Sequence, residues 1–483
     1  MRPLRRSARS HLIAMATETA PPQEQDPQTG APSAPASPAG PVDDDRPISM
    51  PPSLGRARLT QTIRFGMRPL RFMLAPSREL GDVWQLNLIS RDEPMAVTCH
   101  PDHVQSLLKA RPQDAPSLTG ESPLRPILGP NSVLVLVGER HMRERKLLLP
   151  PFHGDAVARY VQMISEVIER EIATWPTGRP FALAPRMQSV TLDVIMAGVF
   201  GIQGHPAPGT PEHRIRETIR RLQRLSTKPA WQLIELMNLG RSEPRGLMRA
   251  VLSRLDNQLY PAIRARRDAG PSRDGSILSL LLEARDEDGQ PLSDEHVRDE
   301  LISLVLAGHE TTANSLAWTF ERLVRSPNPY ARLREVVRSS DREQAEAYVE
   351  ATIHEGMRVR PVIPMIVRLV KRRWQLGDYV VPADTAVAVS IVALHQRPDV
   401  YPDPGQFRPE RFLEHKPGTY TWMPFGGGIR RCLGASLAMA EQRVVLAAVA
   451  RHTDLEPADP KSEPALQRNV TMIPRHGGRV IRR

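Results

Sequence analysis

The chain has 483 residues, of which 40% are hydrophobic and 25% are charged. This length suffices for one large domain or two to three average ones, and the composition is that of a globular protein with a sizeable core. The 65 Lys and Arg residues exceed the 54 Asp and Glu residues, which gives a formal net charge of +11. No zinc-finger or RNA-binding signature accompanies this charge, so we expect no nucleic-acid partner.

The number of cysteines and the N-terminal sequence indicate the cellular compartment. The two cysteines, Cys99 and Cys432, cannot form a disulfide framework and fit a reducing compartment. No segment approaches the roughly 18 consecutive apolar residues that a membrane span needs. The basic N-terminus precedes only a very short apolar patch, which makes a poor signal peptide, and Met15 is an alternative start to Met1. We therefore expect a cytoplasmic protein without a membrane anchor.

The first folded elements are expected after a proline-rich tail. Ten prolines between Pro21 and Pro52 predict a disordered tail over residues 1–52, followed by one domain over residues 53–483. Two apolar runs flanked by turn residues then predict a β-hairpin, and a short helix and a long Pro-, Ser- and Gly-rich loop follow it. These four segments are 82–88, 94–99, 102–110 and 111–131.

Helical periodicity dominates the centre of the chain. Apolar residues recur at helical spacing through residues 155–267 and 277–284. The longest helix is expected to begin at Ser293, with acids in its first turn, and to reach about Arg325, which is roughly 50 Å. Its middle is apolar nearly all round and should be buried. Beyond it we expect a helix over 345–358 and then short strands.

The buried middle of that helix contains the run Ala307-Gly308-His309-Glu310-Thr311-Thr312. A mid-helix glycine costs up to about 1 kcal/mol relative to alanine, and a buried carboxylate is costly unless it is paired. Such exceptions to local rules tend to mark functional sites. The structural alternative is that the Thr hydroxyls bond to carbonyls of their own helix. We favour a functional role, because an acid and an alcohol stand together beside a glycine.

The second cysteine ends a glycine-rich loop, Phe425-Gly426-Gly427-Gly428-Ile429-Arg430-Arg431-Cys432-Leu433-Gly434. We expect Cys432 in the first turn of the apolar helix that follows, where free N–H groups and the helix dipole favour a thiolate. A lone Cys before an apolar helix is most often a small core residue. With no second Cys or His at zinc spacing, a thiolate here would suit an axial ligand to an iron held by a macrocycle.

Four separated motifs resemble those of the cytochrome P-450 family of haem-thiolate monooxygenases. They are the acid-alcohol run at 307–312, the Glu355-x-x-Arg358 pair, the Pro409-Glu410-Arg411-Phe412 segment and the cysteine loop. They occur in the family's order, and the resemblance extends from about Ser53 to the C-terminus. It implies a mainly α fold with small β-sheets (α+β), in which haem b lies between the long central helix and the cysteine-loop helix.

The resemblance also implies roles for individual residues. Cys432 would be the iron ligand, and the other cofactor-binding residues would be His141, Arg145, Arg368, Arg430, Phe425 and Gly428. Glu310 and Thr311 would be catalytic, because the hydroxyl can bond dioxygen and the acid can relay protons. His141 and Arg145 are four apart and share a helix face, although a solvated charged face is the alternative for them. Glu355, Arg358 and Arg411 would form a structural triad.

The implied reaction inserts one atom of dioxygen into an apolar small molecule such as a fatty acid, terpenoid, steroid or polyketide. The electrons would come from a separate ferredoxin and reductase, and Arg430 and Arg431 could dock an acidic ferredoxin. The family prior is a monomer. The alternatives are a haem-thiolate peroxygenase or isomerase, against which Glu310 and Thr311 argue, a haem-binding sensor, and a structural protein with a buried Cys432.

Overall fold

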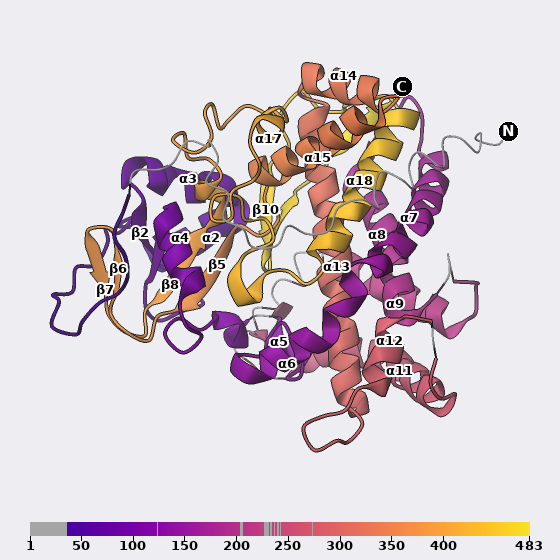
Figure 1. Ribbon diagram of the computed structural model, residues 1–483, viewed down its shortest axis with the longest axis horizontal. Helices are drawn as coiled ribbons and strands as arrows, with labels where there is room; N and C mark the ends of the chain where they lie inside the picture. Colours follow the sequence, from indigo (N-terminus) through magenta and orange to yellow (C-terminus); the bar gives the residue numbers. More distant parts are fainter. Residues whose placement is uncertain are drawn as a thin grey trace. The chain divides into compact units, whose positions relative to one another are not determined.

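The computed structural model describes residues 36–122, 124–202, 206–226, 231, 234–235, 237–238, 241, 243–272 and 274–483. The chain divides into two compact units (Figure 1). Unit 1 comprises the described residues up to Leu118, together with Ile168–Met187 and Thr311–Arg483, and unit 2 comprises Thr119–Val167 and Gln188–Glu310. The long helix α13 (Asp294–Leu323) contributes its N-terminal part to unit 2 and its C-terminal part to unit 1.

The largest sheet of unit 1 has four strands in the order β2-β3-β8-β5. The predicted hairpin is confirmed, because β2 and β3 pair antiparallel with Trp84 opposite Val97. β8 lies parallel to β3 and antiparallel to β5. Every residue of β3 and β8 is buried, so these central strands are covered on both faces. The bounds are β2 (Val83–Leu86), β3 (Met95–Thr98), β5 (Met365–Leu369) and β8 (Ala386–Ser390).

The N-terminal segment is more ordered than the composition predicts. The tail was expected to extend to residue 52, but β1 (Ala39–Pro41) pairs antiparallel with β6 (Trp374–Leu376), which in turn pairs with β7 (Tyr379–Val381). A proline is tolerated here because β1 is an edge strand of this sheet. Residues 1–35 of the expected tail lie outside the described residues.

Two further sheets and nine helices complete the regular structure described in unit 1. The sheets are β10-β11 and β4-β12-β9, formed by Ala465–Arg468, Thr471–Pro474, Pro180–Ala182, Arg479–Arg482 and Leu455–Pro457. The helices are α2 (Arg58–Met67), α3 (Pro69–Glu79), α4 (Pro101–Lys109), α14 (Pro327–Val336), α15 (Arg342–Val359), α16 (Ile391–Leu394), α17 (Arg411–Glu414), the 3-10 turn η3 (Gly428–Arg430) and α18 (Ala435–His452).

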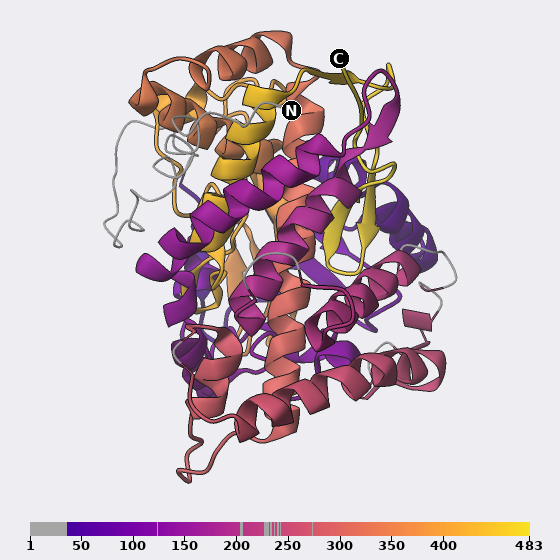
Figure 2. The ribbon, with the colours of Figure 1, turned by 90° about the vertical axis from the view of Figure 1, so that its right-hand side faces the viewer.

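Unit 2 is helical, as the periodicity predicts. Its described elements include η1 (Leu118–Glu121), α5 (Arg125–Leu128), α6 (Gly138–Leu148), η2 (Pro150–Phe152), α7 (Asp155–Ala173), α8 (Leu183–Phe200), α9 (Pro211–Ser226), α11 (Gly246–Asp268), α12 (Ile277–Glu283) and the first half of α13; η1, α7 and α8 have part of their length in unit 1. α13 is one uninterrupted ribbon in both views (Figures 1 and 2). No helix formed by the described residues has both the length and the apolar character to cross a bilayer.

The predicted loop 111–131 contains two short helices and is tied to α13 at its C-terminal end. The Asn131 backbone N–H and side-chain amide both donate to Asp299 Oδ2, each at 3.1 Å. A Cβ on Gly129 would lie 2.1 Å from the Asp299 carboxylate, and the φ of Gly129 is +85°. Glycine at 129 therefore lets the loop close over the Asp299 carboxylate.

Close approach of α15 and α13 within unit 1 depends on Gly356. A Cβ built at this position would lie 2.2 Å from Thr319 Oγ1 and 2.9 Å from Thr319 Cβ. Gly356→Ala should therefore lower the free energy of unfolding by about 1–3 kcal/mol through overpacking. Gly66→Ala is the matched control, because Gly66 is also helical but meets nothing within 4 Å. That control should gain up to about 1 kcal/mol from helix propensity. Equal urea midpoints for the two variants would contradict the packing argument.

Candidate active site

The loop that carries Cys432 lies in unit 1 and differs from the expectation in one respect. The helix that follows it, α18, begins at Ala435 with Gly434 as its N-cap, so Cys432 precedes the first turn instead of belonging to it. The Cys432 backbone N–H donates to the Phe425 carbonyl at 2.9 Å, which closes the loop on itself. The Cys432 side chain is exposed. This exposure rules out a role as a buried core residue within unit 1.

Glycines 427 and 428 are required by packing against α4. A Cβ on Gly427 would lie 2.7 Å from Leu108 Cδ1, and one on Gly428 would lie 2.8 Å from the Leu108 carbonyl oxygen. Gly428 also has a φ of +61°, which non-glycine residues rarely adopt. Both contacts are with the C-terminal end of α4, and they fix the loop's position in the unit.

His395 anchors the segment that leads into the cysteine loop. Its Nε2 accepts a hydrogen bond from the Met423 backbone N–H at 2.8 Å, and its Nδ1 lies 3.2 Å from the Arg358 carbonyl. The ring is therefore neutral with its proton on Nδ1, and burial lowers its pKa to about 3. Both ring nitrogens thus bond to the backbone, which is typical of a structural loop histidine.

The predicted Glu355, Arg358 and Arg411 triad is confirmed as a buried ion cluster. Arg358 donates to Glu355 through Nε at 2.7 Å and Nη2 at 2.8 Å, and Arg411 Nε donates to Glu355 Oε1 at 3.2 Å. Arg358 also donates to three backbone carbonyls of the chain between α16 and α17, at His395, Pro404 and Gln406. Both Glu355 and Arg358 are completely buried. The cluster therefore connects α15 to the segment that precedes the cysteine loop.

Three neutral histidines of unit 1 predict acid sensitivity. Burial is the largest cause that lowers the pKa of His103 to about 4 and those of His354 and His395 to about 3. An unfolded histidine titrates near pH 6.5, so below that pH the unfolded chain binds more protons than the folded one. Stability from these groups is therefore complete above about pH 6.5 and declines as pH falls, by up to about 1.4 kcal/mol per pH unit for each histidine.

The acid sensitivity is measured by urea unfolding between pH 7.5 and 4.5. His103→Gln should flatten the pH dependence, because it removes one of the histidines whose pKa burial lowers. His415, which is exposed, supplies the control variant His415→Gln, which should leave the slope unchanged. Parallel curves for His103→Gln and the unmodified protein would contradict the assignment.

Arg368 is a buried cation without an acidic neighbour. It lies on β5 opposite Val387 of β8 and is 7% exposed. Burial lowers the pKa of this guanidinium to about 10, and no carboxylate of the described residues pairs with it or raises its pKa. Burying an unpaired charge is costly, so an anionic group from outside the described chain would stabilise this position.

The turn of α13 from Gly308 to Thr311 is bonded to α8 on its unit 2 side. Thr191 Oγ1 donates to the His309 carbonyl at 2.7 Å, and His309 Nδ1 lies 2.8 Å from the Val305 carbonyl of the preceding turn. A Cβ on Gly308 would lie 2.8 Å from Ile195 Cδ1, so glycine lets α8 approach closely. Glu310 and Thr311 follow at once and are both partly exposed. Side chains from α8 thus fix the turn that carries the acid-alcohol pair.

The remaining predicted site residues lie on elements of both units. His141 is buried and Arg145 partly exposed, and they stand one turn apart on α6 of unit 2. Arg430 ends the turn η3 of unit 1 and is partly exposed. Phe425 makes an edge contact with Trp422, with ring centroids 6.0 Å apart. Within unit 1 the structure thus assembles Phe425, Gly428, Arg430 and Cys432 in one loop.

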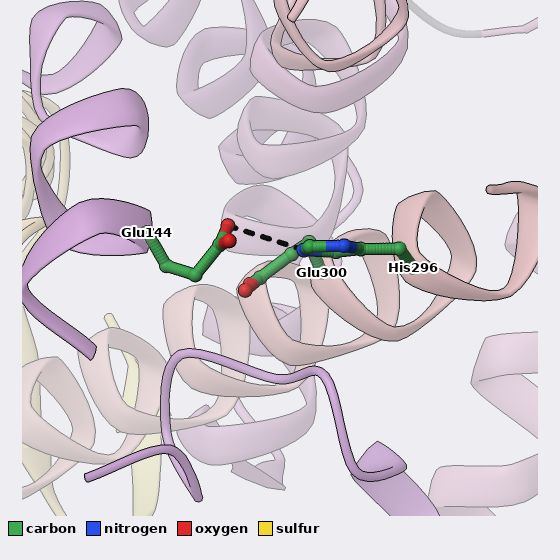
Figure 3. Close-up of side chains that lie close together, drawn as sticks. All are labelled: Glu144, His296 and Glu300. Atoms are coloured by element: carbon green, nitrogen blue, oxygen red, sulfur yellow. Dashed lines mark ion pairs between the residues drawn. The ribbon is translucent and has the colours of Figure 1, made fainter. Parts of the chain in front are cut away.

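One group of potential ligand side chains was missed by the sequence reading. Glu144 on α6 lies close to His296 and Glu300 on α13, all within unit 2 (Figure 3). The i,i+4 spacing of His296 and Glu300 places two metal-ligand side chains on one helix face and is a visible signal. The third residue could not be found this way, because it comes from a helix about 150 positions away in the sequence.

Comparisons with known proteins agree with the motifs. The family model described as cytochrome P-450 matches residues 52–480. A Mycobacterium tuberculosis protein with the family name cytochrome P-450 137 is 38% identical over 378 residues, which are 75% of each chain. A Mycobacterium bovis protein named cytochrome P-450 138 is 34% identical over 450 residues, or 93% of this chain and 98% of the relative. The chain therefore belongs to the cytochrome P-450 family, whose members are generally haem-thiolate monooxygenases.

Solved structures show that the fold is also that of the family. The retinoic acid bound cyanobacterial CYP120A1 has a TM-score of 0.76 at 22% identity and covers 90% of this chain and all of its own. A mutant cytochrome P-450 haem domain has a TM-score of 0.73 at 21% identity, covering 90% of this chain and 98% of its own. The predicted mainly α fold with small sheets is thus confirmed.

The residues present fit the haem that the family normally binds. An exposed thiol in a closed loop supplies the single soft ligand that a macrocycle-held iron requires. A buried guanidinium without an acidic partner in unit 1 supplies a natural counter-charge for a propionate. Both features are explained by an anionic iron macrocycle and by neither a zinc site nor a packed core.

Proposed function

We propose that this protein is a haem-thiolate monooxygenase that inserts one atom of dioxygen into an apolar small molecule. Haem b would supply the chemistry that activates dioxygen, and the Cys432 thiolate would hold its iron. The observation that carries the proposal is the exposed Cys432 in a loop whose glycines pack against α4. The chemical class of the substrate is apolar: a fatty acid, a terpenoid, a steroid or a polyketide.

Different residues of the chain would bind the cofactor and transfer protons. Arg368, Arg430, His141 and Arg145 would hold the propionates, since guanidinium groups pair with carboxylates in a forked geometry. The Thr311 hydroxyl would donate a hydrogen bond to the dioxygen substrate, and the Glu310 carboxylate would relay protons from water. Phe425 and Gly428 would shape the loop around the thiolate.

The electrons would come from a separate ferredoxin and its reductase in the cytoplasm, with the protein acting as a monomer. Arg431 is exposed next to Cys432, and Arg430 is partly exposed. A basic surface at this place would attract an acidic ferredoxin and raise its association rate at low salt. Reversal of these charges should slow reduction by the ferredoxin without altering reduction by dithionite.

The direct experiment is the absorption spectrum of the purified protein, reduced and exposed to carbon monoxide. A strongly red-shifted Soret band would support haem with a thiolate ligand. A haem spectrum without that shift would contradict the thiolate assignment. A folded protein that takes up no haem would contradict the proposal as a whole.

The acid-alcohol pair is tested by Thr311→Ala and Glu310→Gln with a substrate found by spectral screening. Each should lower substrate oxidation per electron consumed by about 10- to 100-fold, since a positioned proton donor contributes about 10²–10⁴-fold. Electrons should then appear as hydrogen peroxide. Glu295→Gln, on an exposed position of the same helix, is the control and should oxidise substrate normally. Undiminished oxidation driven by added peroxide in Thr311→Ala would favour a peroxygenase.

A further inference from the structure

Glu144, His296 and Glu300 converge from two helices of unit 2 on one point. Their ligand atoms all lie within 4.8 Å of one another, and His296 Nε2 is 3.2 Å from Glu144 Oε2. Figure 3 shows the Glu144 carboxylate pointing from α6 toward His296 and Glu300, which stand on neighbouring turns of α13. A cation that holds its ligands at about 2.0–2.2 Å needs them about 3–4 Å apart. Side-chain rotations that move the ligand atoms by roughly 1 Å would therefore bring them to the separations that a bound cation needs.

The three converging atoms are buried, and none of them makes a hydrogen bond within the part of the chain that the structure describes. Glu144 Oε2 and His296 Nε2 form an ion pair with each other at 3.2 Å, and Glu300 Oε2 has no such contact. Glu300 is completely buried, and only its other oxygen is bonded, accepting from the Val133 N–H at 2.8 Å. A buried polar atom without a hydrogen bond costs about 1–3 kcal/mol, so one ligand shared by these three atoms would stabilise the site.

Among the described residues, no basic side chain other than His296 lies against the two carboxylates at this point. No Lys or Arg of the described chain pairs with Glu144 or Glu300, whereas the adjacent Asp299 pairs with Arg298 at 3.0 Å. A divalent ion would supply the positive charge that no Lys or Arg of the described chain provides here.

We propose that Glu144, His296 and Glu300 form a binding site for a divalent transition-metal cation, with Zn²⁺ as the best match. An imidazole favours Zn²⁺ over Mg²⁺ or Ca²⁺, and two carboxylates with one histidine are within the zinc repertoire. The converging atoms are buried, although the side chains of His296 and Glu144 are 17% and 14% exposed, and a water molecule would be the fourth ligand of a tetrahedral ion. The ion would cross-link α6 to α13 within unit 2.

The site has a consequence for α6 that rests on the proposed function. Glu144 is the immediate neighbour of Arg145 and lies three residues from His141, the two residues proposed to hold a propionate. Cation binding would fix the helix that presents them. Zinc binding itself needs no haem, so the site and the monooxygenase assignment are tested separately.

The test is calorimetric titration of Zn²⁺ into the full-length, haem-loaded, chelator-treated protein. We expect one tight site per chain and a rise in the unfolding temperature of about 2–5 °C at saturating zinc. Glu300→Gln keeps the shape of the side chain and should weaken binding at least tenfold, as should His296→Ala. Glu295→Gln, exposed on the same helix, should bind like the unmodified protein. Mg²⁺ should not compete at equal concentration.

Two further variants test whether other residues bind the zinc and whether folding affects the result. Cys432→Ala should retain the same zinc affinity, which shows that the thiol is not the ligand. If Glu300→Gln does not fold, Glu144→Gln on the partly exposed side of the site gives the same comparison. Equal zinc affinity in the unmodified protein and a folded Glu300→Gln or Glu144→Gln variant would overturn the proposal. So would the absence of a saturable site, which would leave Glu300 as a protonated acid.

Discussion

Cys432→Ala is expected to abolish the red-shifted Soret band of the reduced, carbon monoxide-treated protein and to reduce substrate oxidation below detection. Cys432 is the single exposed thiol of the two in the sequence, and it ends a loop held in place by contacts with α4. A thiolate pushes electron density onto haem iron, which favours O–O cleavage, and a methyl group cannot replace it. The measurement is the difference spectrum together with haem content per chain.

Cys99→Ala is the matched control for this experiment. Cys99 directly follows β3 of the four-stranded sheet and is buried. Desolvation raises the pKa of its thiol to about 12. It is therefore an inert core residue, and its variant should keep the full spectrum. A red-shifted band that persists in Cys432→Ala would remove the thiolate assignment. Loss of the band in both variants would point to unfolding instead of ligand loss.

Glu355→Gln is expected to destabilise the protein by about 3–5 kcal/mol, because it leaves two guanidinium groups buried without their carboxylate. Glu355 accepts hydrogen bonds from Arg358, Arg411 and the Arg408 backbone N–H, and is itself fully buried. The segment between α16 and α17 should loosen with it, since Arg358 also binds its carbonyls. Urea unfolding of the haem-loaded protein gives the free energy, and haem release reports on the loop.

Glu346→Gln provides a control on the same helix. Glu346 pairs with Arg342 at 2.6 Å, but Arg342 is 40% exposed, so the pair is solvent-screened. Its loss should cost less than about 1 kcal/mol. A double-mutant cycle between Glu355→Gln and Arg411→Ala should show strong coupling, because the two side chains share one buried cluster. Additive effects, or a cost for Glu355→Gln as small as that of Glu346→Gln, would contradict a structural role for the cluster.

Periodic segments were predictable because their signal is local. The long helix expected from Ser293 to about Arg325 is observed as Asp294–Leu323, and the hairpin strands differ from expectation by one or two residues at each end. These elements have apolar spacing that repeats over many residues, and their ends carry turn and capping residues. The β1 strand was not predictable, because three residues within a proline-rich segment become a strand only when β6 is present to pair with them.

Some features of the candidate site could likewise be predicted from the sequence, and others could not. The Glu355 cluster was correctly predicted, and Cys432 and the Glu310–Thr311 pair could be proposed, because each is a short motif in which residue type and spacing carry the chemistry. The placement of Cys432 before α18, the contact of Gly427 and Gly428 with Leu108, and the buried state of Arg368 were not visible. Each depends on which distant element packs against the residue.

The sequence alone determined the family, the order of its motifs and the mainly helical fold, since these depend on residue type and on periodicity along the chain. Only the tertiary structure decided which polar groups are buried without partners. Glu144 reaches His296 and Glu300 because α6 and α13 pack together, and Arg368 lacks an acid because no described neighbour on its sheet provides one. Burial and pairing are properties of contacts between remote segments, and local sequence does not encode them.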